Sequence, residues 1–469
     1  MTNQIDKQAV MNQDKLTLIH IPFSTLRIMI MRSISLVVIS TLLLTNCSQK
    51  KAPEGQAARV ETTSGPLELP APYATESATT FSKVIGWSDG QMPTAPAGFV
   101  VTEYARDLIN PRWAYVALNG DVFVSESNTE KKGVKKTIAS VSGQAQSQRF
   151  DESANRVTLL RDTNGDGKPD QRSVFLTGLN QPFGMLVLGD YFYVANTDAL
   201  LRFPYKTGST KLSSKPDTVL KLPAGGYNNH WTRNLLASPD GRKIYISVGS
   251  GSNVGENGME YEVRRANILE INPDGSGERV YASGLRNPVG IAWQPGTNRL
   301  YTAVNERDEL GDGLVPDYLT SVQEGGFYGW PYSYYGQVED PRRAGERPEL
   351  VKKAIIPDVP LGAHTASLGL TFYDTKTGTV ASFPAKYQSG AFIGQHGSWN
   401  RSELSGYKVV FVPFTNGKPG KPEDFLTGFV DKNNDENVHG RPVGTFTMSD
   451  GSLLVTDDSG NRIWRVAVE

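Results

Sequence analysis

The stretch NPRWAYVALNGDVFVSES, residues 110–127, contains the repeating unit on which the fold prediction depends. A polar cluster with a proline leads into an apolar run, the turn sequence LNGD follows, and a second apolar run ends in polar residues. Asn-Gly between two apolar runs is typical of a β-hairpin. The stretch therefore predicts two paired strands whose outer ends carry polar side chains.

Five further copies of this unit follow along the chain. They begin at Asn180, Asn229, Arg286, His364 and His439, and the turns LGD, SPDG, QPGT and SDG recur inside them, while the fifth copy has a longer connection. Six units over residues 98–469 average roughly 62 residues each, which leaves room for four strands and insertions. We predict an all-β chain folded as a six-bladed β-propeller. A pair of β-sandwiches explains the recurring unit less well.

Composition agrees with a β protein and excludes one class of partner. The chain has 469 residues with 47 Gly and 28 Pro, which favours many turns and short strands over long helices. Lys+Arg number 48 against 49 Asp+Glu, so the chain lacks the basic excess that is typical of a nucleic-acid-binding protein.

The N-terminal region has the layout of an export signal. Arg32 precedes an apolar run over 34–44, and the only cysteine, Cys47, is followed by polar residues. The run is too short for a membrane span. The arrangement resembles a bacterial lipoprotein signal, which predicts lipidation of Cys47 and a periplasmic or cell-envelope location; the alternative is a secreted protein with an incidental cysteine. We expect 1–30 to be a mis-called leader, 31–46 the signal, 47–80 a flexible tether and 81–469 the propeller.

Propeller geometry predicts where the polar clusters meet. The innermost strand of a blade begins, and the second strand ends, at one face, so all these clusters converge around one mouth of the channel. A lone histidine such as His230 is by default a satisfied polar residue. Here, however, four of the five histidines lie in these clusters, which predicts a site that binds an anion and moves a proton. The set comprises Arg112, Asn180, His230, Arg233, Arg286, Asn287, His364, His396, Arg401, His439 and Arg441.

Three motifs carry a resemblance to a known family. They are GLRNPVGIAW at 284–293, NERDELGDGLVPDYL at 305–319 and GGFYGWPYSYYG at 325–336, followed by HGSWNR and HGRPVG. In this order they resemble the pyrroloquinoline-quinone (PQQ) sugar dehydrogenases of the glucose/sorbosone dehydrogenase superfamily, with the sorbosone or aldose-type branch closer than the glucose branch. The similarity spans about residues 98–469 and implies a six-bladed propeller, PQQ and calcium.

The resemblance also assigns roles to individual residues. It implies that His230 is the base that takes the substrate hydroxyl proton and that Arg286 stabilises charge as hydride reaches the quinone. Asn287 would hold the quinone end beside Arg286, and Arg441 would bind a cofactor carboxylate. The glucose enzymes have a cofactor lysine at the end of the fifth blade, where this chain reads GQHGSWNRSE, so we expect Arg401 to supply that charge.

The metal and substrate positions follow from the same resemblance. Main-chain carbonyls near Asn305, Glu306 and Arg307 would hold the calcium beside PQQ. Tyr328 and Trp330 are expected to stack on the sugar, with a rigid aromatic packing loop as the alternative.

A separate motif, DTNGDGKPD, has oxygen-bearing side chains at alternate positions around a glycine turn, as calcium loops do. Asp162, Asn164, Asp166 and Asp170 are the candidate ligands of a weak structural calcium. The alternative is a plain hairpin rich in Asx turns.

Together these features predict an exported quinoprotein that oxidises a sugar or sugar aldehyde and passes electrons to an external acceptor. Two alternatives stay open: a calcium-dependent six-bladed lactonase, and a non-catalytic propeller that binds glycan or protein.

Overall fold

The computed structural model describes residues 55–130, 144–148, 153–374 and 383–469. Cys47, the expected signal over 31–46 and the expected leader over 1–30 lie outside the described residues, so these predictions are not tested by the structure. Among the residues that are described, no helix is both long and apolar enough to cross a membrane.

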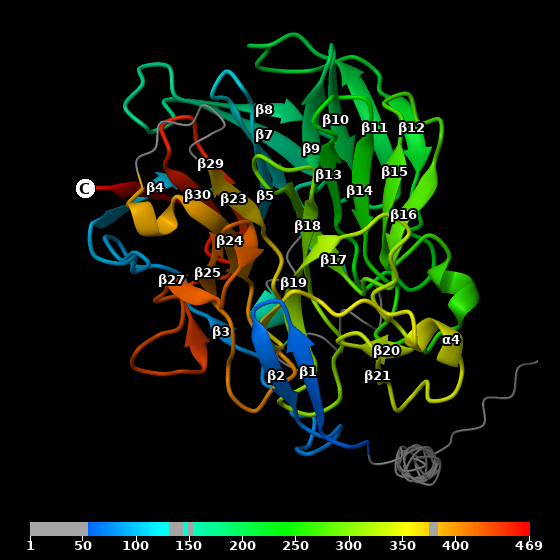
Figure 1. Cartoon of the computed structure of the whole chain (residues 1–469). Helices are drawn as coiled ribbons and strands as arrows, with labels where there is room; N and C mark the ends of the chain where they lie inside the picture. Colours follow the sequence, from blue (N-terminus) through cyan, green and yellow to red (C-terminus); the bar gives the residue numbers. More distant parts are fainter. Residues whose placement is uncertain (1–54, 131–143, 149–152, 375–382) are drawn as a thin grey trace, which may run out of the picture. The chain divides into compact units, whose positions relative to one another are not determined.

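Six antiparallel sheets confirm the β-propeller (Figure 1). Blade one is β5 (Pro111–Val116), β6 (Val122–Glu126), β7 (Arg156–Arg161) and β8 (Gln171–Leu176); blade two is β9 (Met185–Leu188), β10 (Tyr191–Ala195), β11 (Ala199–Pro204) and β12 (Asp217–Lys221). Blade three is β13 (Arg233–Ala237), β14 (Ile244–Val248), β15 (Asn267–Ile271) and β16 (Arg279–Ser283); blade four is β17 (Pro288–Trp293), β18 (Leu300–Val304), β19 (Pro316–Val322) and β22 (Val359–Ala363). Blade five is β23 (Thr371–Asp374), β24 (Ser389–Gln395), β25 (Lys408–Thr415) and β27 (Glu423–Leu426), with β26 (Lys418–Pro419) beside β25.

Blade six joins the two ends of the propeller. It contains β29 (Pro442–Thr447), β30 (Leu453–Asp457), β31 (Arg462–Val468) and, as its outermost strand, β4 (Phe99–Ala105). The register of β31 with β4 runs from Ile463 opposite Ala105 to Val468 opposite Phe99. The first strand of the propeller is thus paired with its last, which closes the ring.

The remaining elements are short and lie between or beside the blades. They are β3 (Lys83–Val84), which pairs with β28 (Asn437–Val438), the pair β20 (Ser333–Tyr334) and β21 (Val338–Glu339), the helices α3 (Gln144–Gln148) and α4 (Pro348–Val351), and the 3-10 turns η1 (Met259–Glu262) and η3 (Ala385–Tyr387).

An apolar plug lies where the repeats meet at the channel. One buried residue from near the start of each innermost strand contributes to it: Trp113, Phe183, Trp231, Val289, Leu368 and Val443. Glycines bring the inner strands close together, since a Cβ at Gly394 would stand 2.1 Å from the carbonyl oxygen of Val443. Because the polar residues of each repeat stand next to the plug residues in sequence, they lie on the mouth side of it.

The N-terminal segment differs from the expected flexible tether. Within 47–80, residues 58–69 form a hairpin of β1 (Ala58–Thr62) and β2 (Gly65–Leu69). Val60 and Leu69 are buried in a cluster that also contains Leu310 and Leu314. Alternating residues on both sides of a Ser-Gly turn account for this hairpin, which was missed because the polar residues dominate the composition.

Candidate functional site

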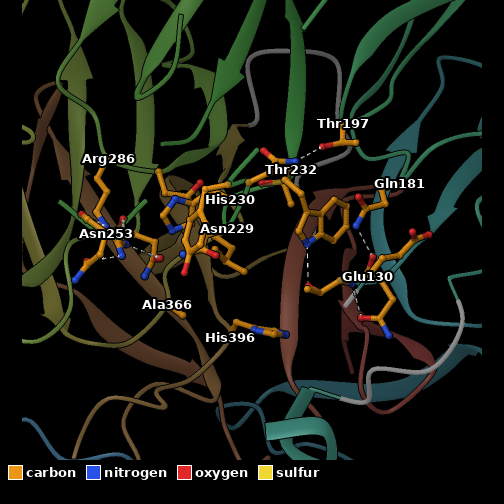
Figure 2. Close-up of a pocket in the computed structure, with 18 of the residues that line it drawn as sticks. Glu130, Gln181, Thr197, Asn229, His230, Thr232, Asn253, Arg286, Ala366 and His396 are labelled. Atoms are coloured by element: carbon orange, nitrogen blue, oxygen red, sulfur yellow. Dashed lines mark hydrogen bonds between the residues drawn. The ribbon is translucent and has the colours of Figure 1, made fainter. Parts of the chain in front are cut away.

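A cavity of about 990 Å³ opens at the mouth where the repeats converge, and residues from all six blades contribute to it (Figure 2). Of the residues predicted to meet there, eight line it: Arg112, Asn180, His230, Arg286, Asn287, His364, His396 and Arg441. The convergence that propeller geometry predicts is therefore seen for most of the set.

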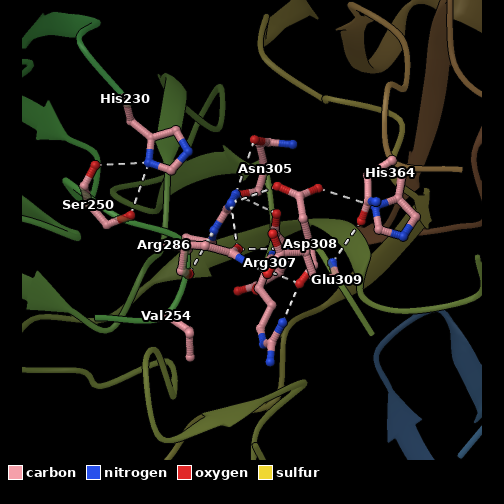
Figure 3. A network of polar contacts seen from close by, with 12 residues as sticks. His230, Ser250, Val254, Arg286, Asn305, Arg307, Asp308, Glu309 and His364 are labelled. Atoms are coloured by element: carbon pink, nitrogen blue, oxygen red, sulfur yellow. Dashed lines mark hydrogen bonds and ion pairs between the residues drawn. The ribbon is translucent and has the colours of Figure 1, made fainter. Parts of the chain in front are cut away.

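His230 lies immediately before β13, and its ring is held by the loop that follows β14. Its Nδ1 stands 2.9 Å from the carbonyl oxygen of Ser250 and 2.9 Å from Ser250 Oγ (Figure 3). Ser250 Oγ donates its own hydrogen to the carbonyl of Ser252 at 2.6 Å, so both neighbours of Nδ1 are acceptors. Nδ1 must therefore carry the proton, which leaves Nε2 with a free lone pair.

Burial and, to a smaller extent, the nearby charge of Arg286 together lower the pKa of His230 to about 3. The imidazole is consequently neutral throughout the physiological range. A neutral histidine with a defined tautomer and a free Nε2 is suited to accept a proton from a ligand in the cavity.

A buried carboxylate fixes the loop that holds His230. Glu262 accepts the backbone N–H of Gly251 at 2.7 Å and also accepts the hydroxyl of Ser252. The orientation of the His230 ring thus depends on a second layer formed by Ser250, Ser252 and Glu262, none of which the sequence pattern indicated.

Asn287 lies beside His230 with an unused acceptor. Asn287 is 5% exposed, and its Oδ1 has no hydrogen-bond partner in the described part of the chain. A Cβ at Gly249 would stand 2.4 Å from Asn287 Oδ1 and 2.5 Å from His230 Cβ, so the glycine permits this close approach. An orphaned buried oxygen on a residue that lines the cavity beside His230 indicates a place for a ligand donor.

Arg286 is anchored by the loop that follows β18. Its guanidinium donates to Asn253 Oδ1 at 2.9 Å and to the carbonyl of Glu306 at 2.5 Å. It also pairs with Asp308 Oδ2 at 2.9 Å and is 2% exposed (Figure 3). Arg286 is thus at the cavity, as predicted, but with its charge already balanced by a carboxylate.

The carbonyls expected to bind calcium have other partners in this structure. Those of Asn305 and Glu306 accept hydrogen bonds from Arg286 Nη1 at 3.3 Å and 2.5 Å. The carbonyl of Arg307 accepts from the backbone N–H of Val315, and its side chain is buried against Asp340. Asn305 and Glu306 do converge on a cationic group, which is what carbonyl ligands would do around a metal, but Arg307 does not face the same point.

His364 continues the same wall of the cavity. Its Nδ1 lies 3.3 Å from Asp308 Oδ1 and its Nε2 lies 2.9 Å from the carbonyl oxygen of Gly311. Although burial opposes charging, the hydrogen bond to Asp308 and the charge of Asp308 raise the pKa of His364. With an acceptor at each nitrogen, His364 is held as a charge partner of Asp308 and not as a free base.

The facing wall contains a second ionic group. Arg112 pairs with Asp458, and His396 Nε2 lies 3.0 Å from both carboxylate oxygens of Asp458. Arg441 is 1% exposed and donates to the carbonyls of His396 at 2.9 Å and Gly397 at 2.8 Å. The predicted carboxylate-binding arginine therefore lines the cavity, but most of its donors serve the fold.

Several predicted site residues do not reach the cavity. Arg401 touches the carbonyl of Ala363 at 3.4 Å and is not part of the lining. Tyr328 is 1% exposed and donates to the carbonyl of Ser321, while Trp330 is 4% exposed and donates to the carbonyl of Asn253. Both polar tips are turned toward backbone carbonyls and neither residue lines the cavity, which agrees with the packing alternative, while stacking on a sugar stays a prediction.

Arg233 and His439 also point away from the mouth. The guanidinium of Arg233 donates to the carbonyls of His230, Thr232 and Pro223. His439 bonds Gln91 and the carbonyl of Gly86. A polar residue at the start of a blade can therefore satisfy the backbone instead of a ligand, and its sequence position does not distinguish the two.

The Asp162–Asp170 turn joins β7 to β8. Asp162 accepts the backbone N–H groups of Asn164, Gly165 and Gly167, and Asp166 accepts that of Lys168. Asp170 accepts from Thr163, and this hydrogen bond lowers the pKa of Asp170. These are Asx-turn contacts, and the structural calcium stays a prediction.

Sequence reasoning missed the carboxylates of the cavity. Six line it: Glu130, Asp198, Glu256, Asp308, Glu309 and Asp458. Asp458 directly follows β30 and Asp308 closely follows β18, so both occupy the same strand-end positions as the predicted Arg, Asn and His residues. In the part of the chain that the structure describes, no three His, Cys, Asp or Glu residues are grouped so that they could hold a metal.

Comparisons with known proteins agree with this fold. The family model described as Glucose / Sorbosone dehydrogenase matches residues 191–398, and one described as TrAA12-like matches 349–469. A protein of Borreliella burgdorferi described as uncharacterized is 31% identical over 303 residues, covering 62% of this chain and 76% of its own length. Quinoprotein glucose dehydrogenase B of Acinetobacter calcoaceticus is 24% identical over 165 residues, covering 29% of this chain and 32% of its own.

Among solved structures, the holo form of the pyranose dehydrogenase PQQ domain from Coprinopsis cinerea has a TM-score of 0.63 at 19% identity. The match covers 82% of this chain and all of that one, and supports the fold. The family-model match lies within blades two to five and agrees with the propeller, so the chain is similar to the glucose/sorbosone dehydrogenase family over somewhat less than half of its length.

Proposed function

We propose that this protein is a sugar oxidoreductase that uses PQQ. The observation that carries the proposal is His230, a neutral base with a free Nε2, which lines a cavity of about 990 Å³ together with Asn287, whose Oδ1 is unpaired. The family match gives this base an oxidoreductase context, and two of the similar proteins are described as a quinoprotein and a PQQ domain.

The residues present fit PQQ in several respects. The cavity has room for a planar tricyclic acid together with a sugar, since ligand pockets of this kind measure roughly 300–1,000 Å³. Arg112, Arg286 and Arg441 line two walls of the cavity and would bind cofactor carboxylates in addition to the partners that each already has in the protein. Trp399 lines the cavity as a flat surface. The cofactor lysine of the glucose enzymes has no lysine counterpart in the described lining, and Arg401 is not part of that lining. We infer that Arg112, although paired with Asp458, supplies that charge.

The protein's own residues account for proton handling. PQQ, when bound, supplies the hydride acceptor. His230 Nε2 takes the proton of the substrate hydroxyl, and Ser250 holds the ring so that Nε2 faces the cavity. Arg286, fixed by Asn253 and Asp308, would stabilise negative charge that develops on the bound cofactor. Asn287 Oδ1 accepts a hydrogen bond and so orients the bound groups.

Calcium is part of the proposal, with an altered arrangement. The carbonyls of Asn305 and Glu306 would hold the ion through the lone pairs that their hydrogen bonds from Arg286 leave unused. Carboxylates outnumber arginines in the cavity lining, and an anionic cofactor adds further negative charge. This negative charge favours a bound cation. A sorbosone-like or aldose-like substrate, an external electron acceptor, export and a lipid anchor at Cys47 complete the proposal; they are supported by sequence features alone.

The carboxylates that line the cavity favour the lactonase alternative. Among the described residues, however, they are not grouped so that they could hold a metal. The non-catalytic alternative does not account for the defined tautomer of His230.

Reconstitution with PQQ tests the proposal. Purified protein is titrated with PQQ, with and without calcium, while the quinone absorption is followed; dye reduction is then measured with aldoses, sorbosone-like aldehydes and polyols. We expect saturable binding at micromolar PQQ and turnover of at least one sugar. Absence of PQQ binding in both conditions would refute the proposal and favour the alternatives.

A further inference from the structure

The segment between the N-terminal hairpin and the propeller runs along the site loops. Residues 73–82, here called the strap, follow β2 and precede β3. The backbone N–H of Tyr73 donates to the carbonyl of Leu310 at 2.8 Å, and that of Thr80 donates to the carbonyl of Trp399 at 2.9 Å. The strap thus runs from the loop after β18 to the loop that follows β24 in blade five.

Two hydroxyls of the strap hold the loop that carries Asp308. Ser77 Oγ accepts the backbone N–H of Gly311 at 3.1 Å, and Thr75 Oγ1 accepts that of Asp312 at 2.8 Å. A Cβ at Gly311 would stand 2.8 Å from the carbonyl oxygen of Thr75, so the two segments lie in close contact. The same Gly311 presents its carbonyl to His364 Nε2 at 2.9 Å. One peptide position therefore joins the strap to the His364–Asp308 pair.

Asn400 links the strap to the same loop from the other side. Its Nδ2 donates to the carbonyl of Ala78 at 2.7 Å, and its Oδ1 accepts the backbone N–H of Glu309 at 2.7 Å. Asn400 is 3% exposed, so both bonds are shielded from water.

The end of the strap reaches the facing wall. Ser82 is 1% exposed and lies within 3.2 Å of Ser147 in α3 and 3.0 Å of the Tyr407 hydroxyl. The carbonyl of Ser147 accepts from Arg441 at 3.1 Å. The strap therefore contacts the supports of both ionic groups that line the cavity.

We propose that the strap positions the site, with Thr75 and Ser77 as positioning residues that set the loop bearing Asp308 and Glu309 against His364. Its value for catalysis rests on the proposed function; its effect on the loop does not. The position of this loop determines where its charged side chains stand in the cavity. A more mobile loop should therefore lower the affinity for a ligand more than it lowers the stability of the protein.

The test compares two double variants. Thr75→Val/Ser77→Ala removes both acceptors of the strap. Thr297→Val/Ser238→Ala is the matched control, because Thr297 and Ser238 likewise accept backbone N–H groups, in the turns of blades four and three. Hydrogen exchange of the cofactor-free protein is followed in the peptide covering 305–312. We expect exchange there to rise roughly five-fold or more in the strap variant and to stay at the wild-type rate in the control.

Binding and turnover give the second readout. We expect the apparent Kd for PQQ to rise by roughly ten-fold in the strap variant, with the thermal midpoint matching that of the control. Asn400→Ala, which leaves the strap sequence intact, should reproduce the exchange change. Unchanged exchange in both the strap variant and Asn400→Ala would overturn the proposal. Failure of wild-type protein to bind PQQ would refute the proposed function while the exchange result still decides the role of the strap.

Discussion

Two histidines on facing walls of the cavity, His230 and His396, have the same residue type and a comparable place in their repeats but different partners. His230 is held through Nδ1 by neutral acceptors of Ser250, which leaves Nε2 free. His396 is held through Nε2 by the carboxylate of Asp458, which also pairs with Arg112. Burial lowers the pKa of each histidine to about 3.

The hydrogen-bond partner of each histidine, and not the residue type, therefore determines its role. Neutral acceptors fix a tautomer and leave a base for a ligand, whereas a carboxylate with two arginines nearby builds an ionic group that stabilises the wall. The predictions below separate these roles.

The largest expected effect concerns turnover. His230→Gln should lower kcat of the PQQ-loaded enzyme by about 10³-fold, since general-base removal typically costs 10²–10⁴-fold. His396→Gln, the matched change on the other wall, should lower kcat by less than about ten-fold. Dye reduction at saturating PQQ measures both, and absorbance titration checks that each variant binds the cofactor. A larger loss in His396→Gln would reverse the assignment.

The next effect concerns stability. Asp458→Asn leaves Arg112 without its buried partner and should lower the free energy of unfolding by about 3 kcal/mol. Asp217→Asn breaks an exposed Arg–Asp pair, 3.2 Å to Arg202, and should cost less than about 1 kcal/mol. Urea unfolding followed by tryptophan fluorescence measures the difference. Equal losses in the two variants would show that the facing wall is not held by its ion pair.

The smallest effect is the pH dependence of stability. An unfolded chain takes up a proton on each histidine below about pH 6.5, whereas His230 and His396 stay neutral in the fold until about pH 3. Each of these two histidines should therefore lower stability as pH falls through this window, whereas the raised pKa values of Glu306, about 7, and Asp317, about 6, act in the opposite direction. Urea midpoints at pH 7.5 and 5.5, measured for the wild type and for His396→Gln, isolate one histidine: the variant should lose less stability on acidification, by about 1 kcal/mol. An equal loss in the variant and the wild type would contradict the inference for His396.

Most of the fold could be predicted because each blade repeats a local pattern. Each unit contains a polar cluster, an apolar run, a turn and a second apolar run. Residues that are close in sequence are therefore enough to predict the paired strands. The ring closure by β4 and the hairpin of β1 and β2 could not be read in this way. Their partners, Ile463 for β4 and Leu310 for the hairpin core, lie hundreds of residues away.

The location of the candidate site could be predicted from the sequence, but only some of the residues that form it could. Propeller geometry brings strand ends together, so His230, Arg286, Asn287 and Arg441 do meet at one cavity. It does not say whether a polar side chain turns to the ligand or to the backbone, and Arg401 turns to the backbone. Nor does it reveal Asp458 as the partner of Arg112, since that pair joins residues 346 positions apart.

The pairing of β4 with β31 has a consequence for the order of events in synthesis. The outer strand of blade six leaves the ribosome before any of its three sheet partners exists, so it waits as an unpaired edge while the first five blades are made. Such a long-range closing step makes folding slow and leaves a strand edge open to intermolecular pairing. Loss of the last few residues of the chain would remove the segment with which β4 pairs, and the edge of β4 would then stay unpaired.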